Sequence, residues 1–276
     1  MKFRPGLFLK ELFLFGSTIL IGIFSAYSYR PLIEKSVVEP QFSSWDDIVI
    51  FLAILAIISV IILKFRKVGG FFLRFFLLLV VFSGSQIIYG SVVSSPWDLA
   101  LAIATVLLFM FVKNVFIHDV GLVLGLAGIS SVLGITISPK TAVFLMVILS
   151  FYDIIAVYWT KHMVYLAKGM MESGAIFGFI IPFKLADLFY HSSEAKKEVG
   201  GRFMVLGSGD IGLPVIMASS VAVVSISQAL VVGFFSLLGL LATHLIFVNQ
   251  SERKPMAALP PIATLTIIGY VVAQLI

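Results

Sequence analysis

The sequence contains no cysteine and little charge, and both absences narrow the class of protein. Without cysteine, disulfide frameworks and thiolate metal sites are excluded. Charged residues make up 12% of the chain, whereas soluble domains usually carry about a quarter. Because 60% of the residues are hydrophobic, too little polar surface remains to cover a water-soluble fold. The composition therefore predicts a membrane protein.

Metal and nucleic-acid functions are also disfavoured. The four histidines are scattered, and none has a histidine partner four residues away on a helix. We therefore expect no metal site and no other cofactor. The net charge of +5 is not concentrated in a basic tract, because lysine and arginine flank apolar segments one after another. This charge indicates membrane topology, and no nucleic-acid partner is expected.

Apolar segments long enough to cross a hydrocarbon core of about 30 Å recur along the whole chain. Residues 99–137 form one apolar run, which as a single helix would be about 58 Å long, so we divide it into two spans. We predict an all-α membrane protein that forms a single polytopic domain over residues 1–276. Its nine transmembrane helices are expected at roughly 11–29, 47–63, 71–90, 97–112, 119–137, 141–160, 203–224, 228–248 and 256–275.

The distribution of lysine and arginine predicts the orientation of this bundle. With the N-terminus inside, sixteen of the nineteen basic residues lie on the inner side, as the positive-inside rule requires. The chain is therefore expected in the cell membrane, with its N-terminus inside and its C-terminus outside. The longest connection, 161–202, becomes an inner loop. Its apolar patch at 175–183 is too short to span, and we expect one or two interfacial helices in the loop.

Two acidic residues lie well within predicted spans. Asp153 is eight residues before Lys161, and Asp210 is eight residues after Arg202. If both segments are helical, each carboxylate lies about 12 Å from the inner boundary. Ionisable groups in a membrane are costly and usually functional. Because these two spans run antiparallel, we expect the carboxylates to face each other.

A facing pair of carboxylates has a defined chemistry. The two groups cannot both ionise cheaply, so they share one proton. The ionised member accepts a proton from water while the protonated member polarises a peptide carbonyl, as in aspartic proteases. The same two acids would also serve a proton-coupled or cation-coupled transporter or channel. The sequence shows no repeated halves, which such transporters often have.

Three short motifs surround these acids. They are Tyr152-Asp153 in the sixth span, Gly207-Ser208-Gly209-Asp210 in the seventh, and Ala257-Ala258-Leu259-Pro260 at the start of the ninth. In order and position they resemble the Tyr-Asp, Gly-x-Gly-Asp and Pro-Ala-Leu motifs of the presenilin and signal peptide peptidase family of intramembrane aspartyl proteases. Alanine replaces the first proline of the third motif. The resemblance is closest to microbial presenilin-like homologues, since the chain lacks long soluble extensions.

The resemblance implies an intramembrane aspartyl endopeptidase with a presenilin-like bundle and Asp153 and Asp210 as its catalytic residues. It implies that Gly207 to Gly209 and Ala257 to Pro260 shape the substrate site. The implied substrates are single-span transmembrane helices or signal peptide remnants, which must unwind locally before cleavage. No obligatory subunits are expected, and a homo-oligomer is compatible with the sequence. Tyr152 either orients Asp153 or packs as an aromatic side chain, and we favour packing. We interpret His244 as a polar residue that hydrogen-bonds between neighbouring helices.

Overall fold

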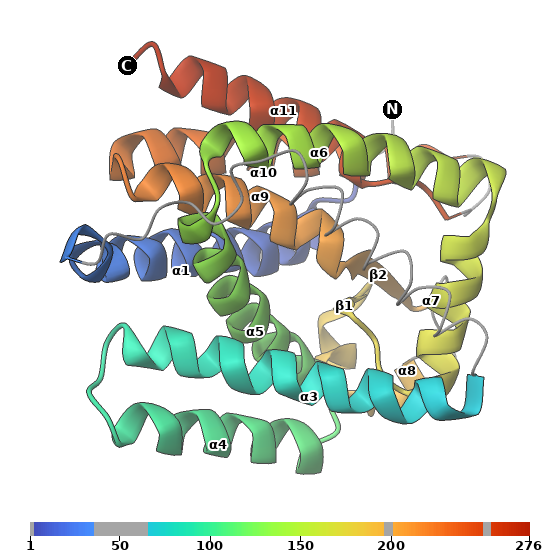
Figure 1. Ribbon diagram of the computed structural model, residues 1–276. Helices are drawn as coiled ribbons and strands as arrows, with labels where there is room; N and C mark the ends of the chain where they lie inside the picture. The colour runs from blue at the N-terminus through green and yellow to red at the C-terminus, as the bar shows by residue number, and fades with distance from the viewer. Residues whose placement is uncertain (1–2, 36–65, 196–200, 251–254) are drawn as a thin grey trace.

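The computed structural model describes residues 3–35, 66–195, 201–250 and 255–276 of the chain. These residues form a helical bundle with one small sheet (Figure 1). The elements are α1 (Pro5–Lys35), α3 (Arg66–Gly90), α4 (Trp97–Phe111), α5 (Val115–Thr136), α6 (Pro139–Ile154), the π-helical turn η1 (Ile155–Trp159), α7 (His162–Ser173), β1 (Gly178–Pro182), the 3-10 turn η2 (Leu185–Phe189), α8 (Ser192–Ala195), β2 (Phe203–Gly207), α9 (Ser208–Ala222), α10 (Ile226–Val248) and α11 (Leu259–Ala273).

The predicted fold class, a helical membrane bundle, is confirmed. Within the described residues, five helices are long and apolar enough to cross a membrane, and α4, α9 and α11 are shorter apolar helices. A helix lies at eight of the nine predicted span positions. The remaining predicted span, 47–63, lies outside the described residues.

Polar residues placed between apolar runs begin several of these helices. The long run 99–137 is divided between α4 and α5, because the Asn114 side chain accepts a hydrogen bond from Ile117 N at 2.8 Å and caps α5. Ser138 caps α6 in the same way, accepting from Thr141 N at 3.2 Å. Pro139 follows at the first helical position, where its missing N–H is not needed.

The seventh span does not begin as the helix that was predicted from residue 203. Residues Phe203–Gly207 form β2, which pairs antiparallel with β1, and the helix begins only at Ser208. The apolar patch at 175–183 supplies β1, whose five residues are all buried. A short apolar run is compatible with either a strand or a helix, so hydropathy alone could not identify either strand. The inner loop thus contains α7 and a strand besides two short helical elements.

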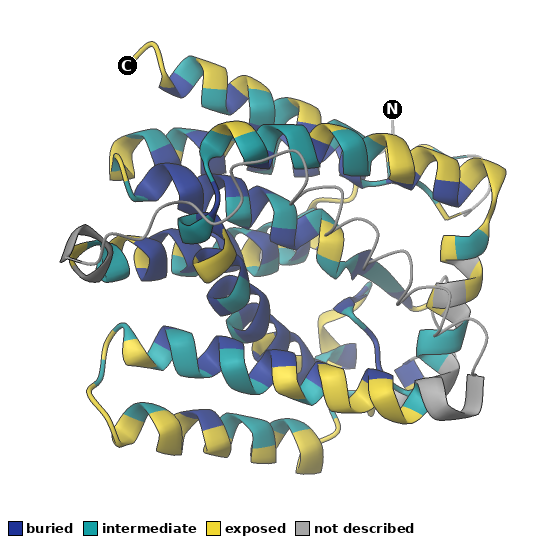
Figure 2. Cartoon of the chain, in the orientation of Figure 1, coloured by how far each residue is buried: buried dark blue, intermediate teal, exposed yellow. Residues whose placement is uncertain are grey.

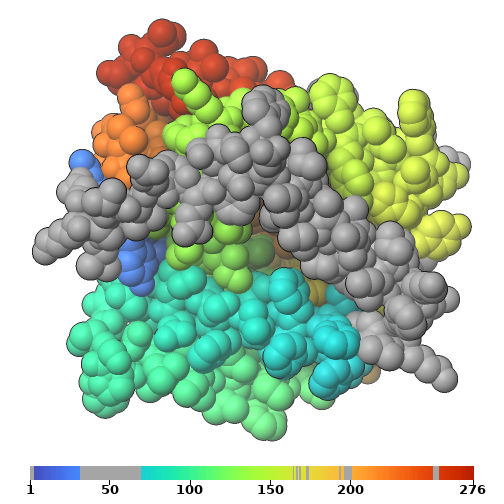
Figure 3. All heavy atoms as spheres, in the orientation of Figure 1, coloured from blue at the N-terminus to red at the C-terminus, as the bar shows by residue number. Residues whose placement is uncertain are grey.

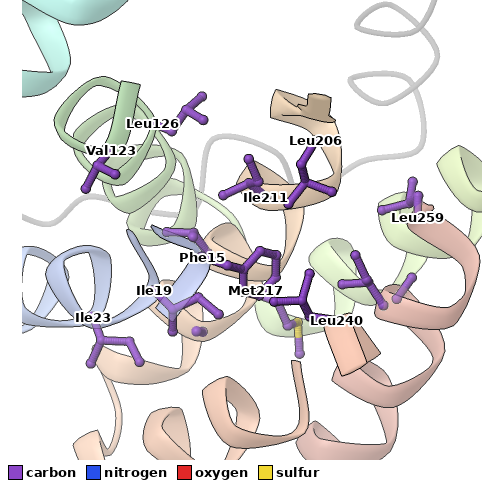
Figure 4. Close-up of a cluster of buried hydrophobic side chains, with 14 of the residues drawn as sticks. Phe15, Ile19, Ile23, Val123, Leu126, Leu206, Ile211, Met217, Leu240 and Leu259 are labelled. Atoms are coloured by element: carbon purple, nitrogen blue, oxygen red, sulfur yellow. The ribbon is translucent and has the colours of Figure 1, made fainter. Parts of the chain in front are cut away.

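Helix α5 occupies the centre of the bundle and is buried along most of its length (Figure 2). It packs against α1, α3 and α9. The α3 contact is a close backbone approach, because a Cβ atom at Gly84 would lie 2.1 Å from the Gly125 carbonyl oxygen. Small residues allow such approaches between membrane helices. On the other side, Phe15 and Ile19 of α1 lie with Met217 and Leu240 in one apolar cluster (Figure 4).

The outward faces of the peripheral helices are apolar. Phe71 and Phe76 of α3 and Phe111 of α4 are each more than half exposed. Figure 3 shows α3 (cyan) and α6 (yellow-green) on one face of the molecule. At the end of α6 and in the turn after it, Phe151 and Trp159 are exposed as well. Such a surface is unfavourable in water and suits contact with lipid chains.

Candidate active site

Asp153 lies near the end of α6, at the point where the helix widens. The next residues form the π-helical turn Ile155–Trp159, a local irregularity that is frequent at functional sites. The Asp153 side chain is buried, with 5% of the residue exposed. Its Oδ2 accepts a hydrogen bond from the backbone N–H of Leu259, the first residue of α11, at 3.3 Å. Two helices far apart in sequence therefore meet at this carboxylate.

Asp210 lies in the first turn of α9, directly after β2. The backbone of Gly207 is hydrogen-bonded to its carboxylate. Asp153 acts electrostatically on Asp210, and helices α6 and α9 pack against each other. The structure thus places the two acids on neighbouring helices, which is what the expectation of a facing pair requires. The depth estimate that led to this expectation was wrong for Asp210, because residues 203–207 rise as a strand and not as a helix.

The small sheet determines where Asp210 begins its helix. Gly178 of β1 pairs with Gly207 of β2, and Ser208 N donates to Phe177 O at 3.0 Å. A Cβ atom at Gly178 would lie 2.4 Å from the Leu206 carbonyl oxygen, so only glycine fits there. Because Gly207 contacts Asp210, the strand pairing holds the start of α9 and its carboxylate.

The glycines before Asp210 differ in their surroundings. A Cβ atom at Gly207 would lie 3.1 Å from Asp210 Oδ2, whereas one at Gly209 would have no neighbour within 4 Å. The space into which a Gly209 side chain would point is therefore open. Ser208 lies between them as the first residue of α9. An absent side chain in open space leaves room for another backbone to approach.

Two residues of α5 that were not among the predicted site residues, His118 and Asp119, also hold the sheet. Asp119 Oδ1 accepts from Ile180 N at 2.8 Å, and His118 Nε2 lies 3.2 Å from Gly178 O. Both side chains are buried. Because a carbonyl only accepts, His118 Nε2 must carry the proton. The sequence signal that could have identified this contact was Asp119, an acid at the start of the predicted span 119–137.

One residue of the segment Ala257 to Pro260 contacts Asp153. Ala257 and Leu259 are buried, and Leu259 supplies the N–H that binds Asp153. Pro260 lies in the first turn of α11, where a residue without an N–H is tolerated. Ala258 O accepts a hydrogen bond from Thr243 of α10 at 3.4 Å. The segment is thus held between α10 and α6.

Tyr152 is 41% exposed and is not an enclosed packing residue. Its hydroxyl lies 2.7 Å from His162 Nε2, and His162 Nδ1 lies 2.6 Å from Thr160 Oγ1. These contacts between Tyr152, His162 and Thr160 link the end of α6 to the start of α7. His162 was not singled out from the sequence as a neighbour of the acids.

Replacing Tyr152 with phenylalanine is expected to lower kcat/KM by no more than about tenfold. The change removes one hydrogen bond, whose net contribution is about 0.5–1.5 kcal/mol. The His162→Ala variant should have a similar effect, and the double variant should add little, because both changes break the same bond. The measurement is cleavage kinetics with a transmembrane peptide. A loss above a hundredfold in Tyr152→Phe would instead assign the hydroxyl to the chemistry.

A helical membrane bundle with acids on two packed helices, α6 and α9, is the arrangement expected of one class of protein, the intramembrane aspartyl proteases. The family comparison identifies the branch. Residues 42–276 match the family described as signal-peptide peptidase, presenilin aspartyl protease, and the chain belongs to that family. It is therefore an integral membrane hydrolase of the aspartyl protease type. No curated protein matches the chain significantly.

Solved structures with the same fold agree with this membership. A presenilin family intramembrane aspartate protease in space group C222 is 24% identical, with 95% of this chain and 96% of that chain covered and a TM-score of 0.58. A structure with the same description in space group P2 has the same identity and coverage and a TM-score of 0.62. At this identity the likeness shows the fold. The transporter alternative finds no support in these comparisons.

Proposed function

We propose that Asp153 and Asp210 are the catalytic pair of this intramembrane aspartyl endopeptidase. The observation that carries the proposal is that Asp153 of α6 and Asp210 of α9 lie on helices that pack against each other, where Leu259 N donates to Asp153. Ionisable side chains inside a membrane are energetically costly, and where they occur they usually serve function. The remaining residues of the three motifs then shape the space in which the scissile bond lies.

The pair would hydrolyse the peptide bond with one shared proton. The ionised carboxylate takes a proton from water as the water oxygen bonds to the carbonyl carbon. The protonated carboxylate donates its hydrogen bond to the carbonyl oxygen and stabilises the tetrahedral intermediate. When the C–N bond breaks, the leaving nitrogen receives a proton from the pair. Water is thus added across the bond without a covalent enzyme intermediate.

Open space beside Gly209 supports the approach of an extended substrate backbone. We propose single-span transmembrane helices or signal peptide remnants as substrates, in keeping with the family's action on transmembrane proteins. A helical peptide bond is shielded by its own turn, so the segment must unwind locally before the acids reach it. The enzyme is proposed to act without obligatory subunits, and a homo-oligomer is compatible with this mechanism.

The activity is expected to be bell-shaped in pH, because the active form holds one proton between the two carboxylates. At lower pH the pair gains a second proton and lacks a base, and at higher pH it loses the shared proton and lacks an acid. A chelator should leave the rate unchanged, and a peptidomimetic with a hydroxyl at the scissile position should inhibit. The measurement is a pH–rate profile on a transmembrane substrate. Activity that rises steadily to high pH, or that a chelator removes, would contradict a shared-proton pair.

We further propose that residues 1–276 form one polytopic domain in the cell membrane, with the N-terminus and the 161–202 loop inside and the C-terminus outside. The excess of lysine and arginine on the inner side supports this orientation. Reporters fused after Lys10 and Glu194 should report the inside, and one after Lys35 the outside. Finding the reporters at Lys35 and Glu194 on the same side would rule out the proposed topology.

A further inference from the structure

A buried histidine–carboxylate pair joins the first helix to the second-last, at a distance of 233 residues in sequence. His244 Nδ1 of α10 lies 3.0 Å from both carboxylate oxygens of Glu11 in α1. Each residue is 1% exposed. The rings of Phe3 and Phe8 pack against the imidazole, with centroids 5.6 and 5.2 Å away. The pair is therefore sealed from solvent by aromatic side chains.

The pair is not explained by stability alone. Well-packed apolar side chains of similar volume often replace a buried ion pair at no cost, whereas loss of one partner is strongly destabilising. Ionisable groups kept inside a membrane bundle therefore usually serve function. Glu11 and His244 belong to neither of the helices that carry Asp153 and Asp210. Any role of the pair in the site must therefore act through the elements that α1 and α10 contact.

Helix α10 supports the segment that binds Asp153. Thr243, next to His244, donates to Ala258 O at 3.4 Å. A Cβ atom at Gly239 would lie 2.7 Å from Ile262 Cα, so the backbones of α10 and α11 are in direct contact. Because Leu259 N donates to Asp153, a shift of α10 along its axis would move the N–H away from the carboxylate.

Helix α1 also supports the other half of the site. Lys10, the neighbour of Glu11, donates from Nζ to Pro182 O at 2.6 Å and to Phe183 O at 3.1 Å. Pro182 is the last residue of β1 and Phe183 follows it. Strand β1 pairs with the strand that leads into α9. Lys10 of α1 thus contacts the sheet that leads to Asp210. The next residue, Glu11, contacts α10, which holds the segment beside Asp153.

We propose that Lys10, Glu11 and His244 form a clamp that sets the spacing of the two acids. Glu11 and His244 fix α10, and through it the first turn of α11 beside Asp153. Lys10 fixes the end of β1, and through the sheet the start of α9 with Asp210. The three are positioning residues that act through the backbone of α11 and β1. This inference rests on the proposed catalytic roles of the two aspartates.

The test is steady-state kinetics of the full-length protein, reconstituted with a labelled transmembrane peptide, at a temperature well below the melting point of every variant. Glu11→Gln, His244→Gln and Lys10→Met are each expected to lower kcat about tenfold while KM changes less than about twofold, since the substrate contacts remain. The double variant Glu11→Gln with His244→Gln restores a neutral hydrogen bond, and its kcat should recover to within about threefold of wild type. Exposed Glu194 provides the control, and Glu194→Gln should match wild type.

A melting temperature that falls while kcat per folded molecule stays at the wild-type level would reduce the clamp to a purely structural role and overturn the proposal. If the single variants do not fold, Thr243→Val takes their place. It keeps the buried pair and removes the hydroxyl that bonds to Ala258 O and, within α10, to Gly239 O. It should therefore lower kcat about threefold, and an unchanged kcat would refute the clamp. The catalytic assignment is judged separately, by whether wild type cleaves in the same assay and Asp210→Asn does not.

Discussion

Replacing Asp153 or Asp210 with asparagine is expected to lower kcat/KM for a transmembrane substrate by at least about a thousandfold. Asparagine has the size of aspartate, and its oxygen can still accept the hydrogen bond from Leu259 N. It can neither take a proton from water nor share one with the other acid. Because the mechanism needs both groups, either single change should remove the activity. The protein should remain folded, since neither change leaves a buried charge unpaired.

The matched control for these variants is Asp98→Asn, the same chemical change at the start of α4. That helix packs against α3 and α5, on the far side of the bundle from α11. Its kcat/KM should stay within about twofold of wild type. The measurement combines cleavage kinetics with thermal melting of each variant. More than a tenth of the wild-type activity in a folded Asp153 or Asp210 variant would be incompatible with the catalytic pair.

Replacing Gly178 with alanine is expected to lower kcat/KM by about a hundredfold or more. The added Cβ atom would lie 2.4 Å from the Leu206 carbonyl oxygen, which is backbone and cannot rotate away. The two strands must separate, and Gly207 and the first turn of α9 move with β2. A displacement of about 1 Å at a catalytic group can cost a hundredfold in rate.

Gly169→Ala tests whether the Gly178→Ala effect is local. Gly169 lies in α7, and a Cβ atom there would meet nothing within 4 Å. Alanine also favours a helix over glycine by about 1 kcal/mol, so this variant should be as stable as wild type and as active. Wild-type activity in Gly178→Ala would show that the pairing of β1 with β2 does not hold Asp210 in place.

The bundle and the acids could be predicted because their signals are local. Each span is a continuous apolar run with polar residues at its ends, and Asn114 marks the break in the longest run by capping the next helix. Asp153 and Asp210 stand out because almost no other acid lies inside such a run. Their motifs then led to the family that the comparison with known families confirmed.

The features that the sequence did not predict depend on contacts between residues far apart in the chain. Residues 203–207 continue the apolar run of α9, and only their pairing with 178–182 makes them a strand. A strand rises about 3.3 Å per residue against 1.5 Å for a helix, so the predicted depth of Asp210 was wrong. No local pattern links Glu11 to His244. That pair can be recognised only when α1 and α10 lie side by side.

The central claim is tested most directly by mass spectrometry of the products that the purified protein makes from a single-span transmembrane peptide. Wild type should give two fragments whose masses sum to the peptide plus one water, cut within or near its apolar segment. The Asp153→Asn and Asp210→Asn variants should return the peptide intact. An intact peptide with wild type, or the same two fragments with either folded variant, would contradict an aspartyl protease acting through this pair.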